Sequence, residues 1–152
     1  MGCPVGYRNK SVAFTNGYMT SYDGITYEYD GFGRRVNINN LRTPLFDSDD
    51  NIVDDYKLTY IYDSTGVVGC YNGTTKYLYR KDTLGNIIAI LDTNGLVVAK
   101  YAYDAWGNHK VVDASGVEIT DLNHVAIKNP FRYRSYYYDT ETGQYILCYR
   151  VR

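Results

Sequence analysis

The chain has 152 residues, of which 45% are hydrophobic and 22% charged, a balance that excludes intrinsic disorder and fits one folded domain. Its 16 Lys and Arg against 17 Asp and Glu give a net charge of −1, which excludes the basic surface that nucleic acid or anionic lipid requires. No apolar run approaches the roughly 18 residues of a membrane span, and the amino terminus has no basic-then-apolar signal pattern.

Tyrosine is the unusual residue, with 19 copies against four Phe and one Trp. It favours strands and packs its ring against a core while its hydroxyl stays solvated. The pattern Tyr-x-Tyr-Asp recurs at residues 27–30, 60–63, 101–104 and 136–139, and a fifth copy at residues 77–80 ends in Arg. Because side chains alternate along a strand, both rings lie on one face and the Asp ends the strand.

A second pattern supplies the turns. Asp-x-x-Gly occurs at Asp30/Gly33, Asp63/Gly66, Asp82/Gly85, Asp92/Gly95, Asp104/Gly107 and Asp113/Gly116, with a looser copy at Asp139/Gly143. Asp at the first position of a type I turn accepts backbone hydrogen bonds, and Gly at the fourth adopts the positive φ that starts the return strand. Each unit is therefore predicted to be strand, turn, strand.

Residues 86–107 show the whole unit. They predict an antiparallel hairpin over residues 87–103 that turns at residues 92–95. In the returning strand Val97, Ala99, Tyr101 and Tyr103 share the face predicted to be buried.

Two stretches lack the regular pattern and are predicted to be loops or insertions, residues 37–55 and residues 115–129. Within the second, residues 119–127 are compatible with one short helix capped by Asp121. No other stretch has the 3.6-residue period over a useful length, so helix content is predicted to be low.

The residue types that carry catalysis or bind metals have simpler explanations here. Cys3, Cys70 and Cys148 form neither a CxxC motif nor a complete disulfide framework, and thiols outside disulfides are predicted. His109 and His124 are predicted to be exposed loop residues, because no partner spacing for zinc accompanies them. There is no Gly-x-Ser-x-Gly motif for a hydrolase nucleophile.

Three further patterns have a functional and a structural interpretation. Asp139 and Glu141 resemble a glycosidase carboxylate pair, but their surroundings have ordinary turn composition. Tyrosine faces beside Asp and Asn suit stacking on sugars, whereas cross-strand packing explains the same spacing. Basic and aromatic residues alternate over residues 131–134, and packing of Arg against Tyr is favoured over single-stranded nucleic acid because the net charge is near zero.

These motifs resemble the Rhs or YD-repeat family, specifically the Rhs repeat-associated core. The resemblance covers essentially the whole chain, and its strongest parts are residues 27–34, 84–92, 101–108 and 129–143, the last beginning Asn-Pro-Phe-Arg-Tyr-Arg. Relatives in this family include secreted bacterial wall-associated and polymorphic toxins, toxin-complex shells and teneurins. The resemblance implies a curved antiparallel β-meander that forms part of a hollow shell around a C-terminal toxin domain.

The same resemblance gives the expectations for function. Residues 1–152 are expected to be a single core segment, truncated at both ends, with a structural role and no catalytic, cofactor-binding or metal-binding residue. Residues 147–152 depart from the family pattern, so the family's self-cleavage aspartates have no counterpart here. Expected partners are the remainder of the parent shell or a C-terminal toxin domain, with self-association through strand edges. The parent is expected to be secreted or at the cell surface. The alternative is a cell-surface carbohydrate-binding module.

Overall fold

The computed structural model describes residues 6–7, 10–39, 44–140 and 142–146. These residues form two compact units, which adjoin in sequence between Tyr56 and Lys57. Strands and tight turns make up nearly all of both units, so the predicted all-β meander is confirmed. No helix in the described part of the chain is long and apolar enough to cross a membrane.

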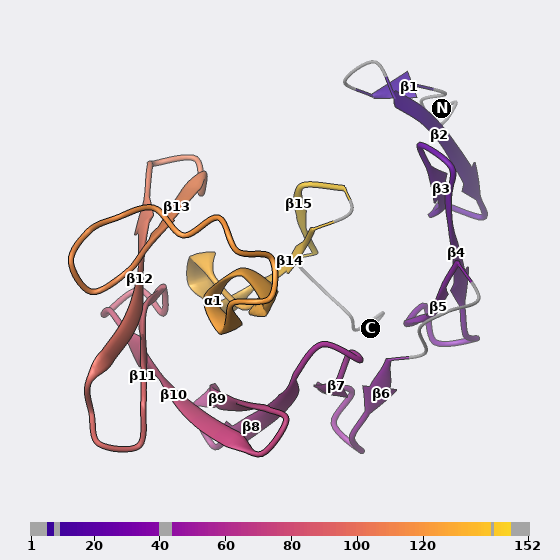
Figure 1. The fold of residues 1–152 in the computed structure, drawn as a ribbon. Coiled ribbons are helices and arrows are strands. Elements are labelled where there is room, and N and C mark those ends of the chain that lie inside the picture. The colour runs from indigo at the N-terminus through magenta and orange to yellow at the C-terminus, as the bar shows by residue number, and fades with distance from the viewer. Residues whose placement is uncertain (1–5, 8–9, 40–43, 141, 147–152) are drawn as a thin grey trace. The chain divides into compact units, whose positions relative to one another are not determined.

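The first unit is a meander of short antiparallel strands (Figure 1). Its strands are β1 (Gly6–Tyr7), β2 (Lys10–Thr15), β3 (Tyr18–Tyr22), β4 (Ile25–Tyr29), β5 (Arg35–Ile38), β6 (Leu45–Phe46) and β7 (Ile52–Asp54). Strands β1 to β5 form a five-stranded sheet in chain order, and β6 pairs with β7. Val12, Tyr22, Tyr27 and Ile38, one from each of β2 to β5, form its buried core.

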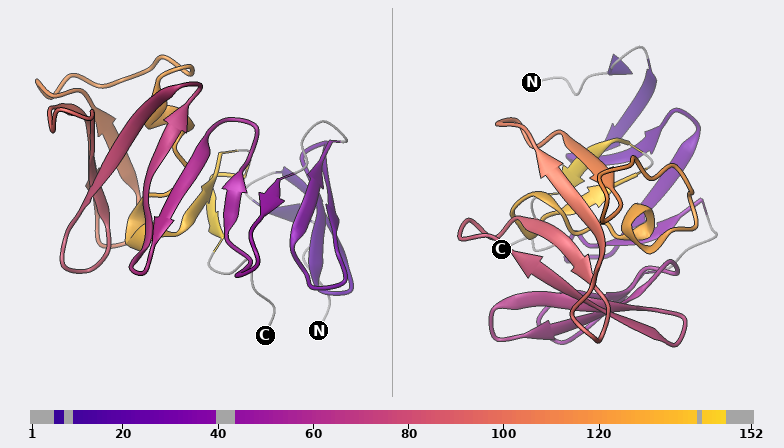
Figure 2. Two further views of the ribbon diagram at one scale, coloured as in Figure 1. Left: turned by 90° about the horizontal axis from the view of Figure 1, so that it is seen from below. Right: turned by 60° about the vertical axis from the view of Figure 1, so that its left-hand side comes forward.

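The second unit continues the same construction and adds a short helical segment. Its elements are β8 (Thr59–Asp63), β9 (Gly66–Asn72), β10 (Thr75–Lys81), β11 (Ile87–Leu91), β12 (Val97–Tyr103), β13 (His109–Val112), α1 (Val125–Lys128), the 3-10 turn η1 (Tyr133–Ser135), β14 (Tyr137–Asp139) and β15 (Gln144–Ile146). Strands β8 to β13 pair antiparallel in chain order, and β14 pairs with β15. Figure 2 shows the successive hairpins with their turns at opposite ends of the strands.

The hairpin predicted for residues 87–103 is confirmed. Strand β11 pairs antiparallel with β12, and the turn occupies residues 92–95. Ala99 and Tyr101 are buried whereas Lys100 and Ala102 are exposed, which is the predicted alternation.

The Asp turns share one set of hydrogen bonds. In the turn of residues 92–95, the Gly95 N–H donates to the Asp92 carbonyl at 3.1 Å, and the Asp92 N–H donates to the Leu96 carbonyl at 2.9 Å. The Asp92 carboxylate accepts the N–H groups of Asn94 and Leu96 at 2.9 and 3.0 Å. The turns that start at Asp30, Asp82, Asp104 and Asp113 repeat this arrangement.

The turn at Asp63 is tighter than its motif predicts. Asp63 is itself paired with Gly66, so only two residues lie between the strands. Its carboxylate accepts the N–H of Thr65 at 2.7 Å and also the Thr65 hydroxyl.

The prediction of a loop over residues 37–55 is partly wrong, because the hairpin β6–β7 lies within it. Its turn starts at Asp47 and has the same backbone bonds as the Asp-x-x-Gly turns, with Asp50 in the glycine position at φ 65°. Asp tolerates the left-handed region better than most residues, and so it replaces Gly there. The motif search missed this turn for that reason.

The helix predicted within residues 119–127 is shorter and later than expected. Helix α1 begins at Val125, and its N-cap is His124, whose Nδ1 accepts the Ala126 N–H at 3.1 Å. Asp121 instead closes a separate turn with Asn123 and His124. The prediction of Asp121 as the helix cap was therefore wrong, because Asp121 accepts hydrogen bonds within the preceding turn instead.

The Gly95 turn gives a direct test of the backbone argument. Gly95 has φ 82°, and a Cβ added there would meet nothing within 4 Å, so a side chain is opposed by backbone strain alone. Gly95→Val is expected to lower the free energy of unfolding by on the order of 1–3 kcal/mol in urea denaturation. The control is Thr93→Val in the same turn, where φ is not positive. Equal stability of the two variants would contradict the assigned turn.

Candidate functional site

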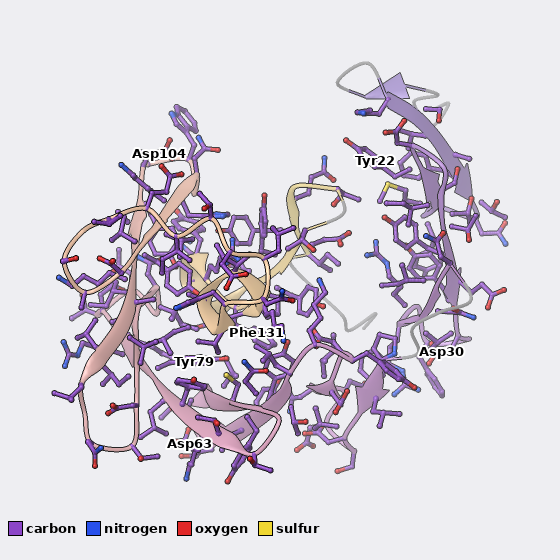
Figure 3. All side chains as sticks on the ribbon, viewed as in Figure 1. Tyr22, Asp30, Asp63, Tyr79, Asp104 and Phe131 are labelled. Atoms are coloured by element: carbon purple, nitrogen blue, oxygen red, sulfur yellow. The ribbon has the colours of Figure 1, made fainter. Side chains whose placement is uncertain are left out.

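The candidate site is the place where one face of strands β8 to β13 is covered by residues 124–146, called here the docked segment; residue 141 is not described. Figure 1 shows these strands curving around α1 and β14. Phe131 of the docked segment and Tyr79 of β10 both lie on the inner side of this curve, whereas Asp104 lies at a hairpin tip (Figure 3).

Backbone and side-chain hydrogen bonds fix the docked segment to the β10–β11 turn. The Ile87 N–H donates to the Arg132 carbonyl at 3.0 Å. The Arg134 N–H donates to Oδ1 of Asn86 at 2.8 Å, and the Ser135 hydroxyl donates to the Gly85 carbonyl at 2.7 Å. The chain of the docked segment is therefore joined to the sheet along its backbone as well as through side chains.

Phe131 and Tyr133 fill the space above the strand tyrosines. The Phe131 ring meets Tyr60 and Tyr62 edge-on, with centroids 4.8 and 6.4 Å apart, and Tyr133 packs 5.9 Å from Tyr103. Edge-to-face contacts of this kind stabilise aromatic clusters beyond their buried area. The Tyr-x-Tyr faces of β8 and β12 are thus the floor of an aromatic core.

Arg132 is the centre of the site. Its side chain is 3% exposed. It donates from Nε to the Asn129 carbonyl at 2.9 Å and from Nη2 to the Ile127 carbonyl at 2.9 Å and the Ala126 carbonyl at 3.4 Å. Those carbonyls end helix α1, where the partial negative charge of a helix favours a cation.

Two tyrosine rings complete the cover of the guanidinium. Arg132 lies 4.9 Å from the centroid of Tyr138 and 5.5 Å from that of Tyr101. The predicted packing of Arg against Tyr over residues 131–134 is therefore confirmed, and Arg134 adds an exposed instance over Tyr133 at 5.5 Å. No described carboxylate is within ion-pair distance of Arg132, so carbonyl dipoles, a histidine and π-faces balance its charge.

Asn129 satisfies its buried amide entirely within this network. It is fully buried, and its Oδ1 accepts the Tyr79 hydroxyl at 2.8 Å. Its Nδ2 donates to the Phe131 carbonyl at 2.7 Å and to the Tyr101 hydroxyl at 3.2 Å. The Tyr101 hydroxyl in turn donates to the Ala126 carbonyl at 2.6 Å. These bonds fix the Asn-Pro-Phe-Arg stretch in one conformation on the strands.

His109 contacts the other side of Arg132. Its Nε2 meets Nη1 of Arg132, and its Nδ1 is 3.3 Å from the hydroxyl of Tyr145. Since a guanidinium only donates, Nε2 must accept, and the proton of the neutral ring belongs on Nδ1. Burial, and then the charge of Arg132, lowers the pKa of His109 to about 4.

The phenols of the site serve as hydrogen-bond donors and not as bases. Burial raises the pKa of Tyr101 to about 12 and that of Tyr145 to about 12, and it also raises the pKa of Tyr103. The Tyr103 hydroxyl donates to the Ile87 carbonyl. The arrangement binds the docked segment to the sheet.

The residues singled out from sequence are dispersed. His109 is half-buried on β13 and His124 is a half-buried helix cap, so the interpretation of both as exposed loop residues was wrong. No local pattern in the sequence indicates that His109 contacts a residue 23 positions away. Asp139 is a buried turn residue whose carboxylate accepts the Thr142 hydroxyl at 3.0 Å. Glu141, Cys3 and Cys148 lie outside the described residues, and Cys70 is buried in β9.

Metal ligands are not brought together in the described part of the chain. No group of three or more His, Cys, Asp or Glu side chains there is placed to hold an ion. The carboxylates of the acidic turn residues accept hydrogen bonds within their own turns. The hydrogen bond from the Asn86 side-chain amide lowers the pKa of Asp82, and the one from Asn108 lowers the pKa of Asp104.

The chain is 39% identical over 137 residues to the tRNA3(Ser)-specific nuclease WapA of Bacillus spizizenii, and 38% identical over 139 residues to the tRNA nuclease WapA of Bacillus subtilis strain 168. Each alignment covers 82% of this chain and 6% of the relative. The chain belongs to the Rhs/YD-repeat family. It spans a small fraction of the length of these YD-repeat relatives.

The likeness extends to a solved structure. The Photorhabdus luminescens Tc holotoxin pore, with a TccC3 mutation, matches at a TM-score of 0.57 and 14% identity, over 91% of this chain and 8% of that chain. At this identity the match establishes the shared YD-repeat β-fold. No family model matches the chain.

Removing the guanidinium tests whether it holds the site together. Arg132→Met is expected to lower the free energy of unfolding by on the order of 2–4 kcal/mol, because three carbonyls at the end of α1 lose their donor. The control is Arg134→Met, which removes an exposed guanidinium from the same segment. Chemical denaturation followed by circular dichroism measures both. Equally small losses of unfolding free energy in the two variants would show that the Arg132 guanidinium does not hold the site together.

Proposed function

We propose that this chain is a structural, non-catalytic segment of a YD-repeat shell that encloses or scaffolds a toxin or another C-terminal domain. The observation that carries the proposal is the repeated hairpin, in which successive strands add edge to edge and the same Asp turn recurs between many of them. In this construction the buried polar side chains of the site serve packing, as the bonds of Arg132 and Asn129 illustrate.

The sequence relatives agree with this role in a limited way. They are named as tRNA nucleases, and the matched region is 6% of their length. We place any such activity outside this segment, in a cargo domain that the wall surrounds. The parent protein would then be secreted or attached to the cell surface, with the rest of the shell and the cargo as its partners.

A wall segment differs from a self-contained domain at its strand edges. In the first unit β5 is the last strand in the order of its sheet, so on the wall proposal it is an edge to which a neighbouring strand would add. In the second unit the edge of β13 is partly covered, since Val112 bridges Glu118 and the Ile119 N–H donates to the Val111 carbonyl at 3.0 Å. Self-association is therefore expected at other strand edges in preference to the edge of β13.

Light scattering after size-exclusion chromatography tests the wall proposal. The isolated chain is expected to self-associate as its concentration rises roughly tenfold, because a net charge of −1 opposes edge pairing only weakly. Binding of a hydrophobic dye is expected to decrease as the edges and faces become covered. A strictly monomeric chain that binds no dye would contradict the wall and favour a closed module.

The second candidate is a carbohydrate-binding module, and one observation favours it. The first unit has a hollow of about 540 Å³ whose lining includes Tyr18, Tyr27, Tyr29, Thr20 and Asn16. Tyr18 and Tyr29 stack with centroids 4.9 Å apart, and hydroxyl and amide groups surround them. Aromatic faces beside polar groups suit a sugar ring.

Glycan-array binding decides between the two candidates. On the shell proposal the chain gives no specific signal. A specific signal that Tyr18→Ala abolishes would support the module, with Tyr71→Ala on β9 of the second unit as the control for loss of a partly exposed tyrosine. A signal that survives Tyr18→Ala would exclude this hollow as the binding site.

A further inference from the structure

The two histidines of the chain act on the same part of the molecule. His124 accepts the Ala126 N–H through Nδ1 and so begins helix α1. His109 contacts Arg132 through Nε2, and Arg132 ties down the carbonyls at the other end of α1. Both contacts use an imidazole lone pair, and a protonated imidazole has none.

The lone pair of His109 is lost on protonation. A second cation would then contact the Arg132 guanidinium, which belongs to a residue that is only 3% exposed. Like charges in contact in a medium of low polarity repel strongly.

The groups that face His109 offer no counter-charge. They are Arg132 from the docked segment, Tyr138 from β14, Tyr145 from β15 and Tyr103 paired opposite it on β12. Burial raises the pKa of Tyr103 and that of Tyr145, so neither phenol supplies a negative charge at physiological pH.

The pairing of strands β8 to β11 uses neither histidine. Strands β8 to β11 pair through their own ladders, and none of the contacts of His109 or His124 described above involves them. The aromatic floor of Tyr60 and Tyr62 on β8 would, however, be uncovered if Phe131 left.

We propose that His109 and Arg132 form an acid-sensitive latch: protonation of His109 releases the docked segment from the sheet while strands β8 to β11 stay paired. The latch would let a wall segment expose its inner tyrosine face in an acidic compartment without unfolding. This inference concerns the conformation of the segment and stands whether or not the wall encloses a cargo.

The sign of the pH dependence follows from linkage. The pKa of His109 is lowered from 6.5 to about 4 in the docked state, so the released state binds a proton first as pH falls. Docking is at full strength above pH 6.5 and weakens as the pH falls from there to about 4. Each pH unit in this window shifts the release equilibrium by up to about tenfold for this group.

Hydrogen–deuterium exchange with mass spectrometry, expressed as protection factors, tests the latch on the intact chain. Between about pH 7 and about pH 4.5 the protection of residues 124–139 is expected to fall by roughly tenfold or more, while that of β9 and β10 changes by less than about twofold. Parallel loss in both regions, or loss in neither, would overturn the proposal on the wild-type chain alone.

Matched variants separate His109 from general acid effects. His109→Gln keeps an acceptor beside Arg132 and does not titrate, so this variant is expected to stay docked at the acidic pH. His124→Asn, which keeps a helix cap, is the control and is expected to release the segment as the wild type does. If His109→Gln, folded at neutral pH, releases the segment to the same extent as the wild type, His109 is not the latch.

Discussion

The second unit depends on one buried guanidinium. Removing Arg132 from water costs several kcal/mol, and no described carboxylate compensates it. The compensation comes from hydrogen bonds to carbonyls, each worth about 1.5–3 kcal/mol when the donor is charged, and from tyrosine faces worth up to about 2 kcal/mol when desolvated. These gains exist only when α1, the docked segment and the Tyr-x-Tyr strands are all in place. Arg132 thus couples elements that local propensity alone would leave independent.

The Asp turns stabilise the structure locally, whereas Arg132 joins distant elements. Each turn carboxylate gathers the N–H groups of its own loop, so the direction of the returning strand is set within five residues. Where Asn or Arg follows the glycine, its side chain binds the second carboxylate oxygen, as Asn108 does at 2.7 Å from Asp104. A meander built from such hairpins can be extended without a large core, because each tyrosine face needs only a thin cover. In the second unit that cover is the docked segment.

Sequence determined the local features and missed the distant ones. The strands, the burial alternation of β12 and the Gly95 turn followed from period-two patterning and turn chemistry, which act over a few residues. The turn at Asp47 escaped because Asp50 adopts φ 65° where the motif requires Gly. The position of α1 was misjudged because His124 is an uncommon cap. The contact between His109 and Arg132 joins elements that only the tertiary fold brings together. No residue close to either of them in sequence indicates this contact.

The central claim is that Arg132 makes α1 and the rest of the docked segment one cooperative structure at neutral pH. Native-state hydrogen exchange against denaturant concentration measures this most directly. The account predicts that the amides of Asn129 at the end of α1 and of Tyr138 on β14, which donate to the Val125 and Pro130 carbonyls, share one opening isotherm with the same free energy and denaturant dependence. Exchange of Asn129 through an opening of clearly lower free energy than that of Tyr138 would contradict the claim, because α1 would then open on its own and Arg132 would not couple it to the rest of the segment.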